Sequence, residues 1–157
     1  MSTIVLSLGG SILVPGLDSP NIKSYISVLS QIARKHRLFV VVGGGGEARR
    51  YISLARSLGV DEASSDELGI LVTRLNATLL IQALGDEAWP QVAESHTQAL
   101  AASVSGRIVV MGGVTPGQTT DAVAAVLAER SGASVFFNLT SVDGIYSADP
   151  KTDSSAC

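Results

Sequence analysis

Residues 43–46 are four consecutive glycines, and they separate an apolar run at residues 38–42 from a segment with helical spacing that contains Arg49 and Arg50. A strand that leads into a glycine loop and then into a helix N-terminus presents unpaired backbone N–H groups and the positive end of the helix dipole. Backbone without side chains also lets an anion approach closely. The sequence therefore predicts that this loop binds a phosphate group of a nucleotide.

Two further glycine turns follow apolar runs elsewhere in the chain. Gly9 and Gly10 come after residues 4–8, and Gly112 and Gly113 come after residues 107–111. An isolated glycine pair most often makes a tight turn. Because the order of apolar run and glycine turn occurs three times, we interpret these turns as parts of one ligand site.

Apolar runs alternate with helical patterns along the chain. This order predicts an α/β fold, a three-layer α-β-α sandwich with a mainly parallel sheet and helices on both faces. In such a sheet, ligands bind at the loops that follow the strands. Apolar residues surround almost the whole of the helix expected at 68–84, which indicates burial on several sides and a role in a subunit interface. The expected strands are residues 4–8, 38–42, 107–111 and 135–139, and the other expected helices are residues 22–33, a segment that ends at Gly59, and residues 121–130.

Composition and charge narrow the class of protein. The 157 residues are 46% hydrophobic, enough for one single-core domain, and no run approaches the length of a membrane span. A net charge of −3 gives no basic footprint for nucleic acid. The single cysteine, Cys157, excludes an internal disulfide and a cysteine zinc site, and the N-terminus lacks the pattern of a secretion signal. We therefore expect a cytoplasmic protein with no nucleic acid or membrane partner.

Two common nucleotide-binding motifs fit this chain poorly. Gly43, Gly45 and Ala48 match the dinucleotide fingerprint G-x-G-x-x-A. That fingerprint belongs to the first strand-to-helix turn of its fold, whereas here another glycine turn precedes it. No Gly-Lys-Ser or Gly-Lys-Thr follows any glycine loop, so the P-loop NTPase interpretation is disfavoured.

Four motifs follow one another along the chain: Gly9-Gly10-Ser11, Gly43 to Arg49, Gly112 to Asp121, and Thr140 to Pro150. In this order they resemble the motifs of the amino acid kinase superfamily, and the resemblance covers the whole chain. Within it, the archaeal type of uridylate kinase is most similar, on the basis of residues 43–45 with Ala48 and Arg49, residues 113–117 and residues 119–125. That resemblance implies a cytoplasmic enzyme of pyrimidine nucleotide biosynthesis, a homo-oligomer in the form of a hexamer built as a trimer of dimers, with ATP, Mg²⁺ and UMP as its ligands. It also implies that residues 1–157 form one amino acid kinase-like domain, with the acceptor (UMP) half, the start of the ATP half, and the C-terminal part of the ATP half missing.

The implied reaction transfers the γ-phosphoryl group of ATP to UMP and gives UDP and ADP. Because the acceptor is already a phosphate oxygen, alignment and charge stabilisation can carry the reaction without a strong general base. The resemblance gives no side chain the role of a metal ligand, and it assigns the catalytic role to Arg49, Gly10 and Gly45. It places Gly10, Ser11, Gly45 and Arg49 on the ATP side, with Thr140, Tyr146 and Asp149 around adenosine. It places Gly44, Asp66, Val114, Thr115, Pro116, Gly117, Gln118, Thr119 and Thr120 around UMP.

Several of these residues have structural alternatives. Arg49 can be a solvated helix residue, which is the interpretation we adopt for Arg50. Asp66 can cap a helix that starts near Glu67, and Thr119 with Thr120 can cap the helix that follows them. Many relatives carry a lysine where this chain has Ser7. The remaining functional alternatives are a phosphotransferase of the same superfamily with another acceptor, such as acetylglutamate, carbamate or isopentenyl phosphate, and a catalytically weak nucleotide-binding or storage module.

Overall fold

The computed structural model describes residues 1–16, 22–141, 144, 147, 153 and 155. Within these residues the strands form one parallel sheet in the order β3-β2-β1-β4, so the first strand lies inside the sheet. The alternating runs predicted a mainly parallel sheet but not the order of its strands, and β3 is shorter than expected. The strands are β1 (Thr3–Leu8), β2 (Arg37–Val42), β3 (Val109–Met111) and β4 (Val135–Leu139).

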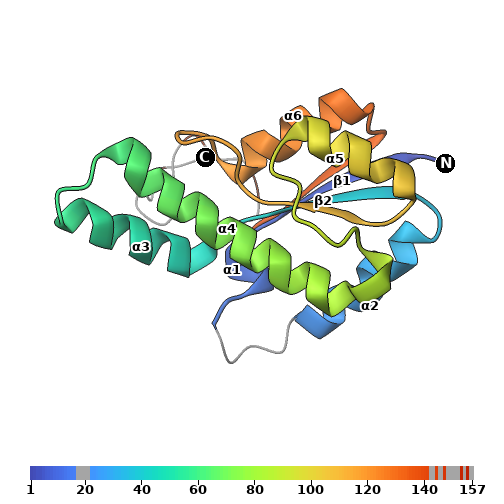
Figure 1. Cartoon of the computed structure of the whole chain (residues 1–157), viewed down its shortest axis with the longest axis horizontal. Helices are drawn as coiled ribbons and strands as arrows, with labels where there is room; N and C mark the ends of the chain where they lie inside the picture. The colour runs from blue at the N-terminus through green and yellow to red at the C-terminus, as the bar shows by residue number, and fades with distance from the viewer. Residues whose placement is uncertain (17–21, 142–143, 145–146, 148–152, 154, 156–157) are drawn as a thin grey trace.

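Helices cover both faces of the sheet (Figure 1). Leu6 of β1 belongs to a core cluster with α2 and α4, whereas its neighbour Val5 belongs to a cluster with α5 and α6. Successive strand side chains point to opposite faces, so both clusters are filled by the same strands. The expected three-layer sandwich is therefore confirmed. The helices are α1 (Gly10–Leu13), α2 (Ile22–Ala33), α3 (Gly45–Ser57), α4 (Glu62–Leu84), α5 (His96–Ala102) and α6 (Thr120–Ser131), with short 3₁₀ turns at Gly85–Glu87 and Ser103–Ser105.

Helix α4 begins six residues earlier than the sequence predicted. Its N-cap is Asp61, whose side chain accepts a hydrogen bond of 3.0 Å from the backbone N–H of Ser64. This bond holds the pKa of the Asp61 carboxyl below its usual value. The prediction relied on apolar spacing, and the first residues of α4 are mostly polar. The start of the helix is set by the Asp61 cap and not by burial of apolar side chains.

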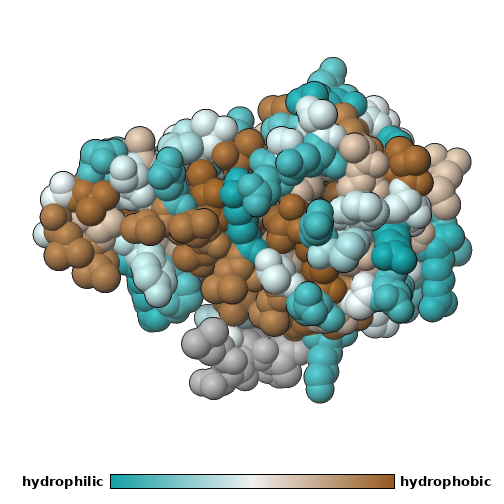
Figure 2. Space-filling view, in the orientation of Figure 1, coloured by the Kyte–Doolittle hydropathy of each residue, from teal (hydrophilic) through white to brown (hydrophobic). Residues whose placement is uncertain are grey.

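Helix α4 also contradicts the expectation that no segment approaches the length of a membrane span. With the following 3₁₀ turn, residues 62–87 are long and apolar enough to cross a membrane by length and composition. One side of α4 is core, since Ala77, Leu80 and Ile81 are buried against the sheet. Figure 2 shows apolar residues gathered over the end of the molecule that α3 and α4 form. On α4 the exposed ones are Leu71, Leu75 and Leu79.

Candidate functional site

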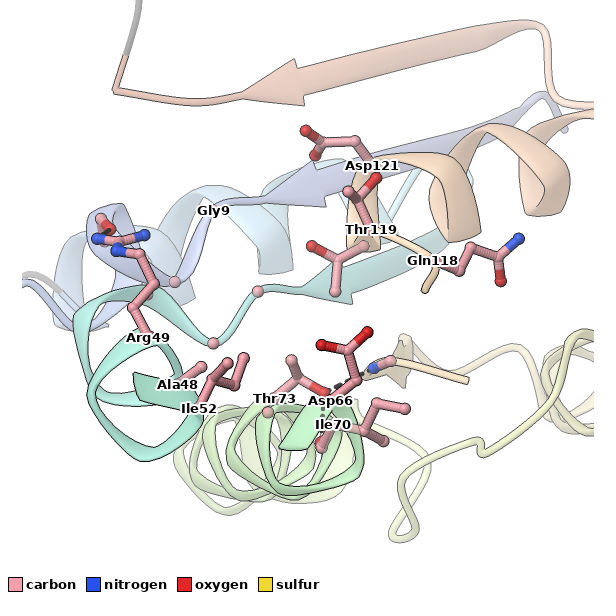
Figure 3. Close-up of a pocket in the computed structure, with 18 of the residues that line it drawn as sticks. Gly9, Ala48, Arg49, Ile52, Asp66, Ile70, Thr73, Gln118, Thr119 and Asp121 are labelled. Atoms are coloured by element: carbon pink, nitrogen blue, oxygen red, sulfur yellow. Dashed lines mark hydrogen bonds between the residues drawn. The ribbon is translucent and has the colours of Figure 1, made fainter. Parts of the chain in front are cut away.

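A cavity of about 480 Å³ opens where β1, β2 and β3 end (Figure 3). Its lining comes from the glycine turns after these strands, from one side of α3 and α4, and from the loop that leads into α6. The volume is in the range of sites for small molecules. The three glycine turns thus meet at one site, as the sequence predicted.

Glycine is required where the first two turns touch. A Cβ added to Gly10 would lie 2.3 Å from the backbone nitrogen of Gly45 and 2.4 Å from the carbonyl oxygen of Gly43. Gly45 itself has φ +64°, in the left-handed region that side chains disfavour. The tight-turn and ligand interpretations are therefore compatible, because close backbone packing brings both loops to the cavity.

Two helix N-termini open at this cavity. Helix α3 begins at Gly45, and α6 begins at Thr120 after its cap Thr119, whose Oγ1 accepts a 3.2 Å hydrogen bond from the N–H of Ala122. The N-terminal N–H groups of both helices favour an anionic ligand. Thr119 lines the cavity while it caps α6, so the capping role does not exclude the predicted ligand role.

Arg49 and Arg50 have different surroundings. Arg49 lies at the cavity, and its Nη2 donates a 3.3 Å hydrogen bond to Ser11 Oγ (Figure 3). Arg50 is exposed and pairs with Glu47 of its own helix at 2.7 Å. The structure thus separates a cavity arginine from a surface arginine, although the two are adjacent in sequence.

Asp66 connects α4 to the loop before α6. Its Oδ2 accepts a 2.7 Å hydrogen bond from the backbone N–H of Gly117, and its carboxylate faces the cavity (Figure 3). The alternative that Asp66 caps a helix starting near Glu67 is wrong, because Asp61 is the cap and Asp66 lies one turn inside the helix.

Three residues that line or support the cavity were not among the predicted site residues. Asp121 lines the cavity and accepts a 2.6 Å hydrogen bond from the buried hydroxyl of Ser7. Asn76 donates to the carbonyl oxygen of Gly43 at 3.0 Å, and Thr73 Oγ1 accepts from the N–H of Gly113 at 2.6 Å. Thr73 and Asn76 could have been found from their polarity inside an otherwise apolar helix, because a buried polar side chain needs a hydrogen-bond partner.

The predicted site residues divide into three groups. The cavity lining brings together Gly10, Ser11, Gly44, Gly45, Arg49, Asp66, Thr115, Gly117, Gln118, Thr119, Thr120 and Thr140. Val114 and Pro116 lie in the same loop but are not part of the lining, and Val114 packs against the core on the side of α5 and α6. Tyr146 and Asp149 lie outside the described residues.

A family model described as the amino acid kinase family matches residues 2–157. The chain belongs to the amino acid kinase family. This membership accounts for the convergence of the glycine turns, and it agrees with the resemblance that the motifs carry. Family membership does not by itself choose a phosphate acceptor.

Named relatives come from methanogenic archaea. The chain is 73% identical over 156 residues to a uridylate kinase of Methanospirillum hungatei, with 99% of this chain and 66% of the relative covered. It is 67% identical to a uridylate kinase of Methanoregula boonei, with 99% of this chain and 67% of the relative covered. The chain therefore spans about two thirds of the length of the relatives it matches.

Solved structures share the fold. The uridylate kinase of Archaeoglobus fulgidus matches with a TM-score of 0.87 and 49% identity, over 100% of this chain and 72% of that one. The isopentenyl phosphate kinase of T. acidophilum matches with a TM-score of 0.62 and 21% identity, over 99% of this chain and 77% of that one. The second likeness shows the fold alone.

Proposed function

We propose that this chain carries the acceptor site of a UMP kinase, which transfers the γ-phosphoryl group of ATP to UMP and releases UDP and ADP. The observation that carries the proposal is the Asp66 carboxylate, fixed by Gly117 beside two helix N-termini. A phosphate and a ribose are the two parts of a nucleoside monophosphate that such a site can bind. The names of the archaeal relatives support UMP as that monophosphate.

On the acceptor side, the phosphate of UMP would lie against the N–H groups of Gly44 and the start of α6. The ribose would lie toward Asp66, whose Oδ2 is occupied by Gly117 and whose Oδ1 is left for a ribose hydroxyl. Residues 114–120 would enclose the rest of the nucleotide. A carboxylate suits ribose because it accepts from hydroxyl donors with charge assistance.

On the donor side, ATP would lie along Gly10, Ser11 and Gly45, with Thr140 toward adenosine. Tyr146 and Asp149 complete this part of the proposal. Arg49 would neutralise charge on the phosphoryl group in transfer, and Ser11 holds its guanidinium at the cavity. Phosphoryl transfer needs such positioned charge more than a proton acceptor.

ATP carries Mg²⁺, which would neutralise phosphate charge during transfer. Among the described residues no group of three or more His, Cys, Asp or Glu side chains could hold a metal ion. The described part of the cavity does supply one carboxylate near the sheet, Asp121, which is oriented by Ser7. This fits Mg²⁺, which takes one or two carboxylates and otherwise binds substrate phosphates.

The test is ADP release from the purified chain with Mg-ATP, measured with UMP and with a panel of other acceptors. We expect release that depends on UMP. Faster turnover with an acid such as acetylglutamate, or with isopentenyl phosphate, would overturn the choice of acceptor. Nucleotide binding without turnover would support the binding-module alternative.

The proposal includes a cytoplasmic homo-oligomer, a hexamer built from dimers. Exposed leucines on α4 support an interface, since Leu71, Leu75 and Leu79 form one stripe that lacks a partner within the described chain. In antiparallel α4 helices related by a two-fold axis at Leu75, each Leu71 would meet Leu79 of the other copy. Leu75→Cys in a Cys157→Ser background should then form a disulfide-linked dimer, whereas Val104→Cys, which is even more exposed but lies outside the stripe, should not. A monomer in light scattering would contradict this interface.

A further inference from the structure

Arg74 is the one charged residue of α4 between Glu67 and Leu84. Its side chain is only 24% exposed, although leucines next to it on the same helix face solvent. Burying a guanidinium costs free energy unless its donors are satisfied. The hydrogen-bond partners of Arg74 must therefore compensate for the cost of burying its guanidinium.

Those partners are a carboxylate and a backbone carbonyl. Arg74 Nη1 lies 3.0 Å from Glu94 Oε2, and Arg74 Nε donates a 3.3 Å hydrogen bond to the carbonyl oxygen of Gly113. Glu94 is itself held, because its backbone N–H donates to Gln98 Oε1 at 2.8 Å. The planar guanidinium joins α4, the segment before α5 and the loop after β3 in one contact.

Gly113 is held at both of its backbone polar atoms by consecutive residues of α4. Its N–H donates to Thr73 Oγ1, and its carbonyl oxygen accepts from Arg74. A Cβ on the preceding residue, Gly112, would lie 2.7 Å from Thr73 Oγ1 and 2.9 Å from Arg74 Cγ. The loop therefore lies directly against α4, and no side chain fits between them.

We propose that Arg74 is a positioning residue for the acceptor, which acts by fixing the loop of residues 112–119. This inference rests on the proposed function and deepens it. Gly113 lines the cavity, and the same loop supplies the Gly117 N–H to Asp66 and the Thr119 cap of α6. Arg74 does not line the cavity, so it acts on the acceptor through Gly113.

The first test is hydrogen exchange without any substrate. Gly113, Gly117 and Gln118 all have bonded backbone N–H groups in this loop. Arg74→Met keeps the apolar stem and removes the guanidinium, and we expect faster exchange in peptides covering residues 112–119, with β1 and β2 unchanged. Arg34→Met, at an exposed position after α2, is the matched control and should change neither segment.

The second test is steady-state kinetics with UMP and ATP varied separately. Arg74→Met should raise KM for UMP about three- to tenfold, the effect of losing one hydrogen bond, with KM for ATP and kcat within about twofold. Arg74→Lys should give a smaller rise, because an ammonium can still pair with Glu94 but lacks the planar fork that also reaches Gly113.

Each of the two tests can contradict a different part of the proposal. Unchanged exchange in residues 112–119 would overturn the role of Arg74 and leave the proposed function intact. Faster exchange in a chain that does not use UMP would overturn the proposed function and leave the loop contact standing. If Arg74→Met does not fold, Glu94→Gln removes only the charge of the half-exposed partner, and we expect the same pattern at reduced size.

Discussion

The two sides of the cavity are built differently. On the proposed acceptor side, α4 is bonded to the loops through Asp66, Thr73 and Asn76, at distances of 2.6–3.0 Å. The other side follows β4, and every residue of β4 is exposed, including Phe136 at 41% and Phe137 at 50%. A parallel strand normally has both faces covered. The proposed acceptor side is thus held by hydrogen bonds within the chain, while the proposed donor side adjoins a strand whose residues are all exposed.

This contrast predicts that UMP binding and turnover depend on different parts of the cavity. If UMP binds as proposed, a wall that is already hydrogen-bonded would lose little conformational freedom, which favours affinity. Phosphoryl transfer also requires the donor nucleotide in line with the acceptor. We therefore expect UMP binding to depend mainly on the α4 contacts, and turnover to depend in addition on the side that adjoins β4.

The largest effect is expected where the first two glycine turns touch. Gly10→Ala should lower stability by about 3 kcal/mol or more, because its methyl group would overlap the backbone of Gly43 and Gly45. Thermal unfolding should shift down by about 6 °C or more. Gly46→Ala is the control: nothing lies within 4 Å of its added Cβ, and alanine favours a helix, so stability should hold or rise.

Arg49→Ala tests the proposed role of Arg49 in neutralising charge on the phosphoryl group during transfer. Loss of one charged donor to the transferring group should lower kcat about 100-fold or more, with the melting temperature nearly unchanged because Arg49 is exposed. Arg50→Ala, one residue along the same helix, removes an exposed pair with Glu47 and should keep kcat within about twofold. Equal kinetics for both variants would remove Arg49 from the site.

Asp66→Asn tests the acceptor side alone. The amide oxygen can still accept from Gly117, but the charge offered to the ribose is lost, so KM for UMP should rise about tenfold. KM for ATP should remain close to that of the parent chain. A rise for ATP as large as that for UMP would break the proposed division of the cavity.

The smallest effect is expected on β4. Phe137→Ser should change the free energy of unfolding by no more than about 0.5 kcal/mol, because the ring is half exposed. It should also reduce self-association in sedimentation, since it removes an apolar side chain from an exposed strand. Denaturation of Val5→Ala provides the contrast: Val5 is fully buried in the adjacent strand, and the loss should be about 1 kcal/mol or more. Comparable losses for the two variants would show that β4 is covered in solution.

The sequence predicted the fold and the meeting of the glycine turns because both follow from local patterns. Apolar runs mark strands, and a glycine turn after a parallel strand must lie at one edge of the sheet. The start of α4 and the partner of Asp66 were not predictable in this way. Gly117 is 51 residues from Asp66, and Glu94 is 20 from Arg74, so only the folded chain brings these pairs together.

Calorimetric titration of the chain with UMP, in the absence of ATP, tests the central claim most directly. We predict saturable binding with one UMP per chain, weakened about tenfold by Asp66→Asn and unaffected by the control Glu67→Gln. Absence of UMP binding by a folded chain that binds ATP would contradict an acceptor site on α4.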